Sequence, residues 1–265
     1  MTNYDGGVIL AIDSSAGASV AVLDDGQVRA QWRTAETTTH AEVLAGAVAQ
    51  TMRDADVTGT DIRVVVVGVG PGPFTGLRVG LALAHSLAEV WGVPLHGVCS
   101  LDSLAQRSLN QPAAPGTSAP VEFLAASDAR RREVYWARYR ADAQGFAELL
   151  DGPRVSAATE LPDLPVVGVG ASLYPQALTA RSAAESRWLP DAVELGQLAQ
   201  RELAQDPRGQ GRPASGPTQP DVTPDLAPDA RPDTLAISVL REPLPLYLRE
   251  SDAKVPAQMR TKQAP

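Results

Sequence analysis

Several residue types are scarce in this sequence, and each scarcity excludes some classes of function. One cysteine, Cys99, occurs among 265 residues, so no disulfide can form within the chain. We therefore expect a buried thiol in a reducing cytoplasm. Positive charge is also scarce, because 23 lysines and arginines stand against 31 aspartates and glutamates, a net charge of −8. Such a chain lacks the clustered basic side chains that bind nucleic acid unaided.

Long apolar runs and histidine pairs are missing as well. No apolar run reaches the roughly 18 residues that span a bilayer, and Met1–Gly7 has neither the basic nor the apolar part of a secretion signal. We therefore expect a cytoplasmic protein without a membrane partner. His40, His85 and His96 are the only histidines, and no two share the H-x-x-x-H spacing. The absence of this spacing excludes a helical zinc motif.

The most informative stretch is residues 64–80, VVVVGVGPGPFTGLRVG. Its four valines predict a strand buried on both faces. The glycines and prolines that follow predict a stiff, sharp turn, since glycine permits positive φ and proline fixes φ. We expect Thr75 to cap a helix over Leu77–Trp91. A strand, a rigid turn and a helix N-terminus in succession form a place where α/β proteins bind anions or partners.

Two common phosphate-binding signatures fail on this stretch. A Walker loop requires a Gly-Lys-Ser/Thr step, and no lysine is present here. A dinucleotide fingerprint that starts at Gly68 meets Pro73 where its third glycine should stand. One that starts at Gly70 meets Thr75 at that position. The stretch is therefore specific for neither site.

The N-terminal segment offers a second phosphate hypothesis. Residues 8–12 form a short apolar strand that ends in Asp13-Ser14-Ser15, and residues 19–23 return as a strand. Such a loop can wrap a phosphate with backbone amides while the aspartate holds a metal or a water. The alternative is a hairpin turn whose Asp and Ser side chains bond to their own backbone, which the residues alone favour.

Two helices have more small and apolar surface than one core needs. Residues 39–54 form a helix with a Thr39/Glu42 capping box. An apolar stripe on it includes Val43, Leu44 and Ala47. His40 is interpreted as a capping or interface residue, because no orienting partner for a general base is apparent. The helix over residues 77–91 is apolar around most of its circumference, as in a core or a partner surface.

The second half of the chain reads as another lobe. We expect a joint at residues 110–120, strands at 121–127, 134–140, 145–150 and 164–169, and helices at 172–180 and 192–204. Arg130–Arg132 suggest either an RNA contact or, more commonly, a solvated turn. Gln205–Asp233 has seven prolines and no aromatic residue, which predicts a disordered insertion. The division is 1–109, 110–120, 121–204, 205–233 and 234–265, with residues 243–249 returning to the body.

These motifs, with His40-Ala41-Glu42, residues 126–135 and Tyr247-Leu248-Arg249, resemble the TsaB (YeaZ) family in order and spacing. The resemblance covers about residues 7–204 and 243–252. Its diagnostic part is the Gly-Pro-Gly-x-Phe-Thr-Gly block at residues 70–76. It implies an α/β, two-lobed fold of the actin, sugar-kinase and Hsp70 type (ASKHA).

The resemblance also implies a function and partners. TsaB-like proteins support the synthesis of threonylcarbamoyladenosine (t6A) beside the anticodon of tRNA. They bind the catalytic paralogue TsaD through helices of the first lobe, a TsaE ATPase joins, and they form homodimers alone. TsaD carries a metal-binding histidine pair, whereas here His96 has no second histidine after it. We therefore expect an accessory subunit without catalytic or metal-binding residues.

The expected sites form two groups. The partner-binding group, for TsaD or a second copy, is His40, Val43, Leu44, Ala47, Phe74, Arg78 and Leu83. The candidate nucleotide or phosphate loop is Asp13, Ser14, Ser15, Gly70, Gly72, Thr75 and Gly76. The chain alone is expected to need no cofactor. ATP or ADP and a metal belong only to the assembled complex, and tRNA is reached only through it.

Two other functions stay open at this stage. A small-molecule kinase or ATPase of the same fold would use Asp13 to hold phosphate and magnesium. Tight ATP binding with turnover that depends on Asp13 would favour that hypothesis. A metallopeptidase ranks last, because the sequence has no zinc histidine pair, no Gly-x-Ser-x-Gly elbow and one cysteine.

Overall fold

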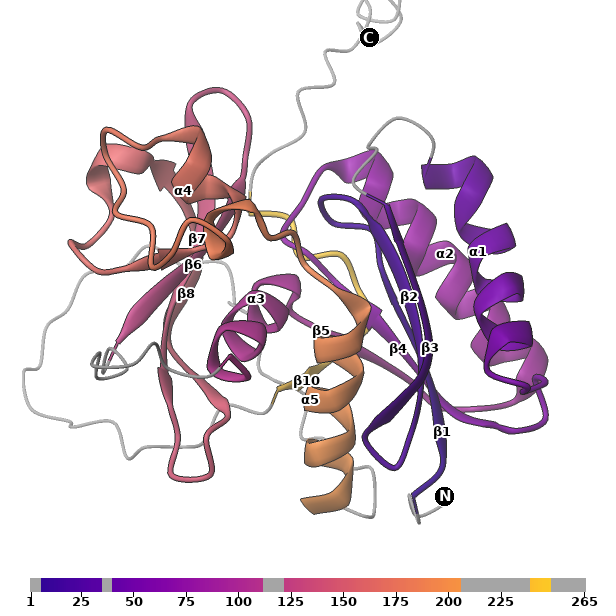
Figure 1. Ribbon diagram of the computed structural model, residues 1–265. Helices are drawn as coiled ribbons and strands as arrows, with labels where there is room; N and C mark the ends of the chain where they lie inside the picture. Colours follow the sequence, from indigo (N-terminus) through magenta and orange to yellow (C-terminus); the bar gives the residue numbers. More distant parts are fainter. Residues whose placement is uncertain (1–5, 35–39, 112–121, 206–238, 249–265) are drawn as a thin grey trace, which may run out of the picture.

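A computed structural model describes residues 6–34, 40–111, 122–205 and 239–248 of the chain. Two β-sheets stand side by side in it, with helices around them (Figure 1). The expected two-lobed α/β arrangement is therefore confirmed. The disorder expected for Gln205–Asp233 concerns residues that, apart from Gln205, lie outside the described ranges. None of the described helices is long and apolar enough to cross a membrane.

The first sheet has six strands in the order β10-β5-β4-β1-β2-β3. They are β1 Val8–Asp13, β2 Ala18–Asp24, β3 Gln27–Thr34, β4 Ile62–Gly68, β5 Leu95–Val98 and β10 Leu240–Arg241. β1, β4 and β5 run parallel, while β2, β3 and β10 are antiparallel to their neighbours. The four valines of β4 are all buried, as expected of a strand covered on both faces.

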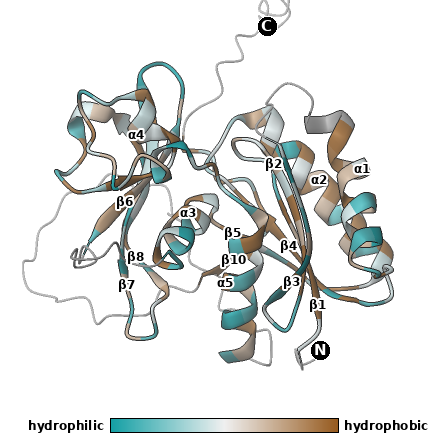
Figure 2. Ribbon diagram, viewed as in Figure 1, coloured by the Kyte–Doolittle hydropathy of each residue, from teal (hydrophilic) through white to brown (hydrophobic). Residues whose placement is uncertain are grey.

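Helices cover both faces of this sheet. Helices α1 His40–Asp54 and α2 Phe74–Trp91 pack on one face, and α5 Ala192–Gln205 packs on the other (Figure 1). In Figure 2 the inner strands are largely hydrophobic, whereas α5 alternates between hydrophilic and hydrophobic residues. That alternation fits a helix with one buried face. The structure differs here from the expected lobe 121–204, since α5 joins the core of the first lobe.

The second sheet has four strands in the order β8-β7-β6-β9. They are β6 Phe123–Asp128, β7 Glu133–Ala141, β8 Ala147–Ala157 and β9 Val166–Val167. Helix α3 Ser100–Leu109 packs against this sheet and against α5, so it lies between the lobes (Figure 1). Cys99, before α3, is buried as expected. Burial raises the pKa of its thiol, which disfavours the reactive thiolate.

Short elements complete the second lobe. They are α4 Val169–Leu173 and the 3₁₀ turns Ala158–Glu160 and Glu185–Arg187. The helix expected over residues 172–180 is wrong, because the helix there ends at Leu173. Pro175 gives the reason, since a proline disfavours helical geometry in the residue before it. The Arg130–Arg132 turn between β6 and β7 has three successive positive φ angles of 62°, 55° and 66°. Arg130 pairs there with Asp128.

Candidate functional site

Asp13 lies at the point where β1 and β4 end together, beside the Gly/Pro turn. The two strands are parallel, so their carboxyl ends meet at one edge of the sheet. The Asp13 side chain is nevertheless only 1% exposed. Its Oδ1 accepts hydrogen bonds from the backbone N–H of Ser15 (2.9 Å) and from the Ser15 hydroxyl (2.7 Å). Both hydrogen bonds lie within the loop, as expected of a hairpin turn whose side chains bond locally and not of an open phosphate site.

The second oxygen of Asp13 is held by Ser100, a residue outside the expected phosphate loop. The Ser100 hydroxyl donates to Asp13 Oδ2 at 2.6 Å and accepts from the Gly70 N–H at 3.1 Å. Ser100 is the first residue of α3, whose cap position is occupied by Cys99 without a side-chain bond. Ser100 instead ties the strand end to the turn. Its position directly after a buried strand was the available signal.

The turn is closed so tightly that only glycine fits at three positions. A Cβ atom at Gly68 would overlap the Asp13 carboxylate, and one at Gly72 would overlap the Ser15 carbonyl oxygen. A Cβ at Gly80, on α2, would overlap the Ser14 hydroxyl. The Asp-Ser-Ser loop and the Gly/Pro turn therefore pack directly on each other. A phosphate could not enter between Gly72 and Ser15, or between Gly80 and Ser14, as they stand.

Two residues of the expected phosphate loop lie in the first turn of α2, where Thr75 is outside this closed contact and Gly76 takes part in it. The helix begins at Phe74, and Pro73 occupies the cap position without a side-chain bond. The capping role expected for Thr75 is therefore wrong, since Thr75 is an exposed residue of the first helical turn. Gly76 contributes its carbonyl oxygen, which accepts the Ser14 hydroxyl at 2.8 Å. Because the Ser14 hydroxyl donates to Gly76, it is not available to donate a hydrogen bond to a ligand.

Burial dominates the electrostatics of this junction. Burial raises the pKa of Asp13, and the hydrogen bonds from Ser100 and Ser15 lower it only in part. Because the Asp13 side chain is 1% exposed, a magnesium ion or phosphate could reach it only by opening the loop. Among residues 6–34, 40–111, 122–205 and 239–248, no three His, Cys, Asp or Glu side chains gather in a way that could hold a metal.

The expected partner-binding residues divide by burial. Leu44 is 0% exposed and Ala47 is 5% exposed, because both point into the core between α1 and the sheet. Their assignment to a contact surface does not fit this placement. Val43 and Leu83 are half-buried, and the His40 side chain lies outside the described part. Three outward residues of α1 are instead small, namely Ala45, Gly46 and Ala49, and Gln50, Arg53 and Asp54 are exposed toward its C-terminal end.

Phe74 and Arg78, two further expected partner residues, bind a distant part of the same chain. The Phe74 and Tyr247 ring centres lie 4.5 Å apart. The Arg78 Nε donates to the Tyr247 hydroxyl at 2.9 Å. Nearby, the backbone N–H of Leu246 donates to the Val69 carbonyl oxygen at 2.8 Å. Residues 243–248 therefore return to the first lobe, beside the start of α2.

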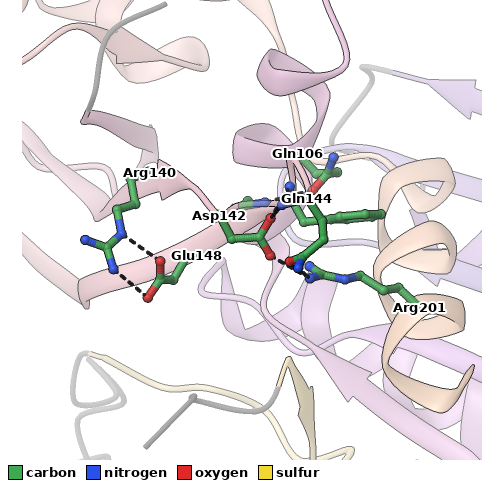
Figure 3. A network of polar contacts seen from close by, with 8 residues as sticks. Gln106, Arg140, Asp142, Gln144, Glu148 and Arg201 are labelled. Carbon is green, nitrogen blue, oxygen red and sulfur yellow. Dashed lines mark hydrogen bonds and ion pairs between the residues drawn. The ribbon is translucent and has the colours of Figure 1, made fainter. Parts of the chain in front are cut away.

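Contacts between the lobes were not visible in the sequence. At the tip of the β7–β8 hairpin, Asp142 forms an ion pair with Arg201 of α5 at 2.5 Å (Figure 3). The Arg201 guanidinium carbon lies 3.9 Å from the centre of the Phe146 ring. Gln106 of α3 accepts the Ala147 N–H at 3.0 Å, and Arg140 pairs with Glu148 on the same hairpin (Figure 3). These bonds fasten the second sheet to α5 and α3.

Comparison with known proteins was made against this geometry. A family model described as "TsaD: tRNA N6-adenosine threonylcarbamoyltransferase" matches residues 34–174. An uncharacterized protein of Mycobacterium tuberculosis is 37% identical over 180 residues, covering 67% of this chain and 78% of the relative. The tRNA threonylcarbamoyladenosine biosynthesis protein TsaB of Escherichia coli is 37% identical over 139 residues, covering 52% of this chain and 57% of that protein.

Solved structures agree with the sequence relatives. A Pseudomonas aeruginosa protein, titled as similar to the peptidase YEAZ, superposes with a TM-score of 0.67 and 26% identity. The match covers 92% of this chain and all of the other. YeaZ from the same organism gives a TM-score of 0.64 and 28% identity, covering 75% of this chain and 93% of that structure. The expected two-lobed α/β fold is confirmed, and the chain belongs to the TsaB (YeaZ) family.

Proposed function

We propose that this protein takes part in t6A biosynthesis as a non-catalytic subunit. In this role it binds a TsaD-type catalytic subunit, and a TsaE-type ATPase joins the assembly in the cytoplasm. The chain has no cofactor of its own, so ATP or ADP and a metal enter only with the complex. tRNA is reached only through the complex. Support comes from the family and from the contrast between a closed loop and an open helical face.

The open face carries the proposal. Helices α1 and α2 cover one side of the first sheet and contact each other. Several of their outward residues are small or apolar, namely Ala45, Gly46 and Ala49 on α1 and Ala82, Ser86 and Val90 on α2, while polar and charged residues such as Gln50, Arg53, His85 and Glu89 are exposed on the same helices. Val90 is 79% exposed, and a Cβ at Gly46 would meet no atom within 4 Å. Small outward residues let helices of another protein approach closely.

The same face offers a site for self-association. A second copy of this chain could lay its own α1 and α2 against it, because the small side chains of this face allow close approach. A homodimer and a complex with the catalytic subunit would then compete for one surface. This competition predicts that the homodimer dissociates as the catalytic subunit is added.

The loop supports a structural rather than a catalytic role for Asp13. A kinase or ATPase would need a carboxylate open to a magnesium ion, yet both oxygens of Asp13 accept hydrogen bonds within the chain. Because burial raises the pKa of this group, an uncharged amide is a mild replacement. Asp13→Asn should therefore leave the biological role intact provided that the variant folds.

The test is complementation in bacteria that lack their own TsaB, with t6A in tRNA measured by mass spectrometry. Wild type, Asp13→Asn and the exposed second-lobe control Ala177→Arg should restore t6A. Gly46→Arg should not, because its long charged side chain blocks the α1 surface while its Cβ enters open space. Full restoration by a folded Gly46→Arg would contradict the assigned surface. Loss of t6A in a folded Asp13→Asn would favour a catalytic loop.

A further inference from the structure

A cavity beside the closed loop has features that the proposed function does not use. It measures about 330 Å³, within the range of small-molecule pockets. Its walls come from the β1–β2 turn, the end of β3, α3 and the segment before α5. The lining residues are Gly17, Ala18, Ser19, Arg33, Thr34, Arg107, Arg187, Trp188, Leu189, Pro190 and Asp191. Both lobes therefore contribute to it.

The charge of this cavity is opposite to that of the chain. Three arginines and one aspartate line it, although the whole protein carries a net charge of −8. Arginine presents a planar set of donors that matches the oxygens of phosphate or carboxylate. Three guanidinium groups around one cavity favour an anion with two charges over a single carboxylate.

Two of the arginines are already held in place. Asp191 lies 3.2 Å from Arg33 and 3.9 Å from Arg107. The Arg107 guanidinium also stacks over the Trp188 ring, 4.5 Å from its centre. A site whose donors are fixed before binding loses less conformational entropy when the ligand arrives. Asp191 thus orients the basic groups while leaving the lining positive.

Two further groups have unused hydrogen-bonding capacity. Arg187 is exposed, and its guanidinium group forms no ion pair or hydrogen bond with the rest of the described chain. The Ser19 side chain, 3% exposed, accepts the Ala192 N–H at 2.9 Å, but its own hydroxyl proton has no acceptor in the described ranges. Both groups line the cavity. An anion could accept a hydrogen bond from each.

The remaining wall is apolar and partly flat. Trp188, Leu189 and Pro190 follow one another along it. Such a wall favours a ring system over a bare inorganic ion, because burial of apolar surface adds to the attraction of charge. We propose that this cavity binds a phosphomonoester that also contains a flat ring system, of the size and chemistry of a nucleoside monophosphate.

Isothermal titration calorimetry on the full chain tests this proposal with AMP as the probe. AMP should bind saturably and more tightly than either inorganic phosphate or adenosine. Arg187→Gln and Arg33→Gln should each weaken AMP binding about tenfold, equal to about 1.4 kcal/mol. Arg63→Gln is the matched control, since it removes the same charge from an exposed position on β4, outside the cavity. Its affinity should equal that of wild type.

Three results would overturn the proposal. One is the absence of saturable AMP binding up to millimolar concentration. Another is equal loss of affinity in Arg187→Gln and Arg63→Gln, which would indicate general charge attraction. The third is binding of an RNA oligonucleotide through these arginines with no binding of AMP, which would assign the surface to RNA. The measurement uses the isolated chain, so its outcome is independent of partner binding by α1 and α2.

Discussion

Glycine occupies two regions of the first lobe for opposite reasons. Behind Asp13, at Gly68 and Gly72, a single added carbon would overlap the chain's own atoms. On the outer side of α1, an added carbon at Gly46 would meet nothing within 4 Å. The first region is a filled interior, where glycine lets two loops touch. The second is an open surface, where glycine leaves room for another molecule.

The comparison also shows that a loop can have the residue types of a phosphate site and still serve a structural role. The Asp-Ser-Ser loop and the Gly/Pro turn have the residue types of a phosphate site, but they satisfy each other's hydrogen bonds. Their role in this chain is to fix the start of α2. The outer face of α1 and α2, with its small residues Ala45, Gly46 and Ala49, is then the part available for function.

The largest predicted effect is on the filled region. Gly68→Ala should destabilise the protein by about 3 kcal/mol or more, because the new methyl group must displace the buried Asp13 carboxylate and break its bond to Ser100. Urea unfolding followed by circular dichroism measures this change. A loss below about 1 kcal/mol would mean that the junction can relax and is not filled as described.

The next effect concerns a buried carboxylate on α5. Burial, and secondarily Asp191, raises the pKa of Glu194 from 4.5 to about 7. Its Oε2 has no hydrogen-bond partner in the described part of the chain. Since the folded pKa lies above the unfolded one, the folded state is favoured below pH 4.5 and loses stability as pH rises through 7.

Glu194→Gln should remove this loss. The difference in unfolding free energy between variant and wild type should shift in favour of the variant by at most about 3 kcal/mol from pH 4.5 to pH 8. This figure follows from about 1.4 kcal/mol per pKa unit. Unfolding free energies of both proteins at the two pH values provide the measurement. A difference between them that does not change with pH would show that Glu194 titrates normally.

A smaller effect is expected at the contact between the lobes. A double-mutant cycle with Asp142→Asn and Arg201→Gln should give a coupling energy of about 1 kcal/mol, since the pair is partly buried and Arg201 also packs on Phe146. The exposed pair Arg154 and Asp151 on β8 is the matched control. Equal coupling in the two cycles would remove the special role of the hairpin tip.

The smallest effect has the opposite sign. Gly46→Ala should stabilise the isolated chain by about 0.5–1 kcal/mol, because alanine is the better helix former and the added methyl group enters open space. Thermal unfolding gives the sign directly. A destabilised variant would show that the α1 surface is covered by the chain itself, and the contrast between the two regions would fail.

Sequence patterns predicted the elements better than the contacts between them. Val64–Val67 form the central strand as expected, because four β-branched residues in a row leave little choice. Leu44 and Gly46 lie two positions apart on one helix, yet only the structure shows which of them faces outward. Arg201 and Asp142 are 59 positions apart, and neither has a local pattern that predicts the pair.

The sequence predicted which residues form the candidate site, but it did not predict that the loop is closed. Asp13, Ser14 and Ser15 were assigned together with Gly70 and Gly72, and the structure does bring them to one place. That the loop is closed follows from Ser100 and from the backbone of the turn, which no motif includes. The cavity beside it needed four separate segments to assemble, so local sequence gave no sign of it.

The central claim is that the outer face of α1 and α2 binds the catalytic subunit while the Asp13 loop stays closed. Its most direct test is calorimetric titration of a TsaD-type subunit into wild type, Gly46→Arg and Ala177→Arg, each checked for folding by circular dichroism. The account predicts that Gly46→Arg loses at least tenfold in affinity and that Ala177→Arg binds as wild type does. Undiminished binding by a folded Gly46→Arg would contradict it.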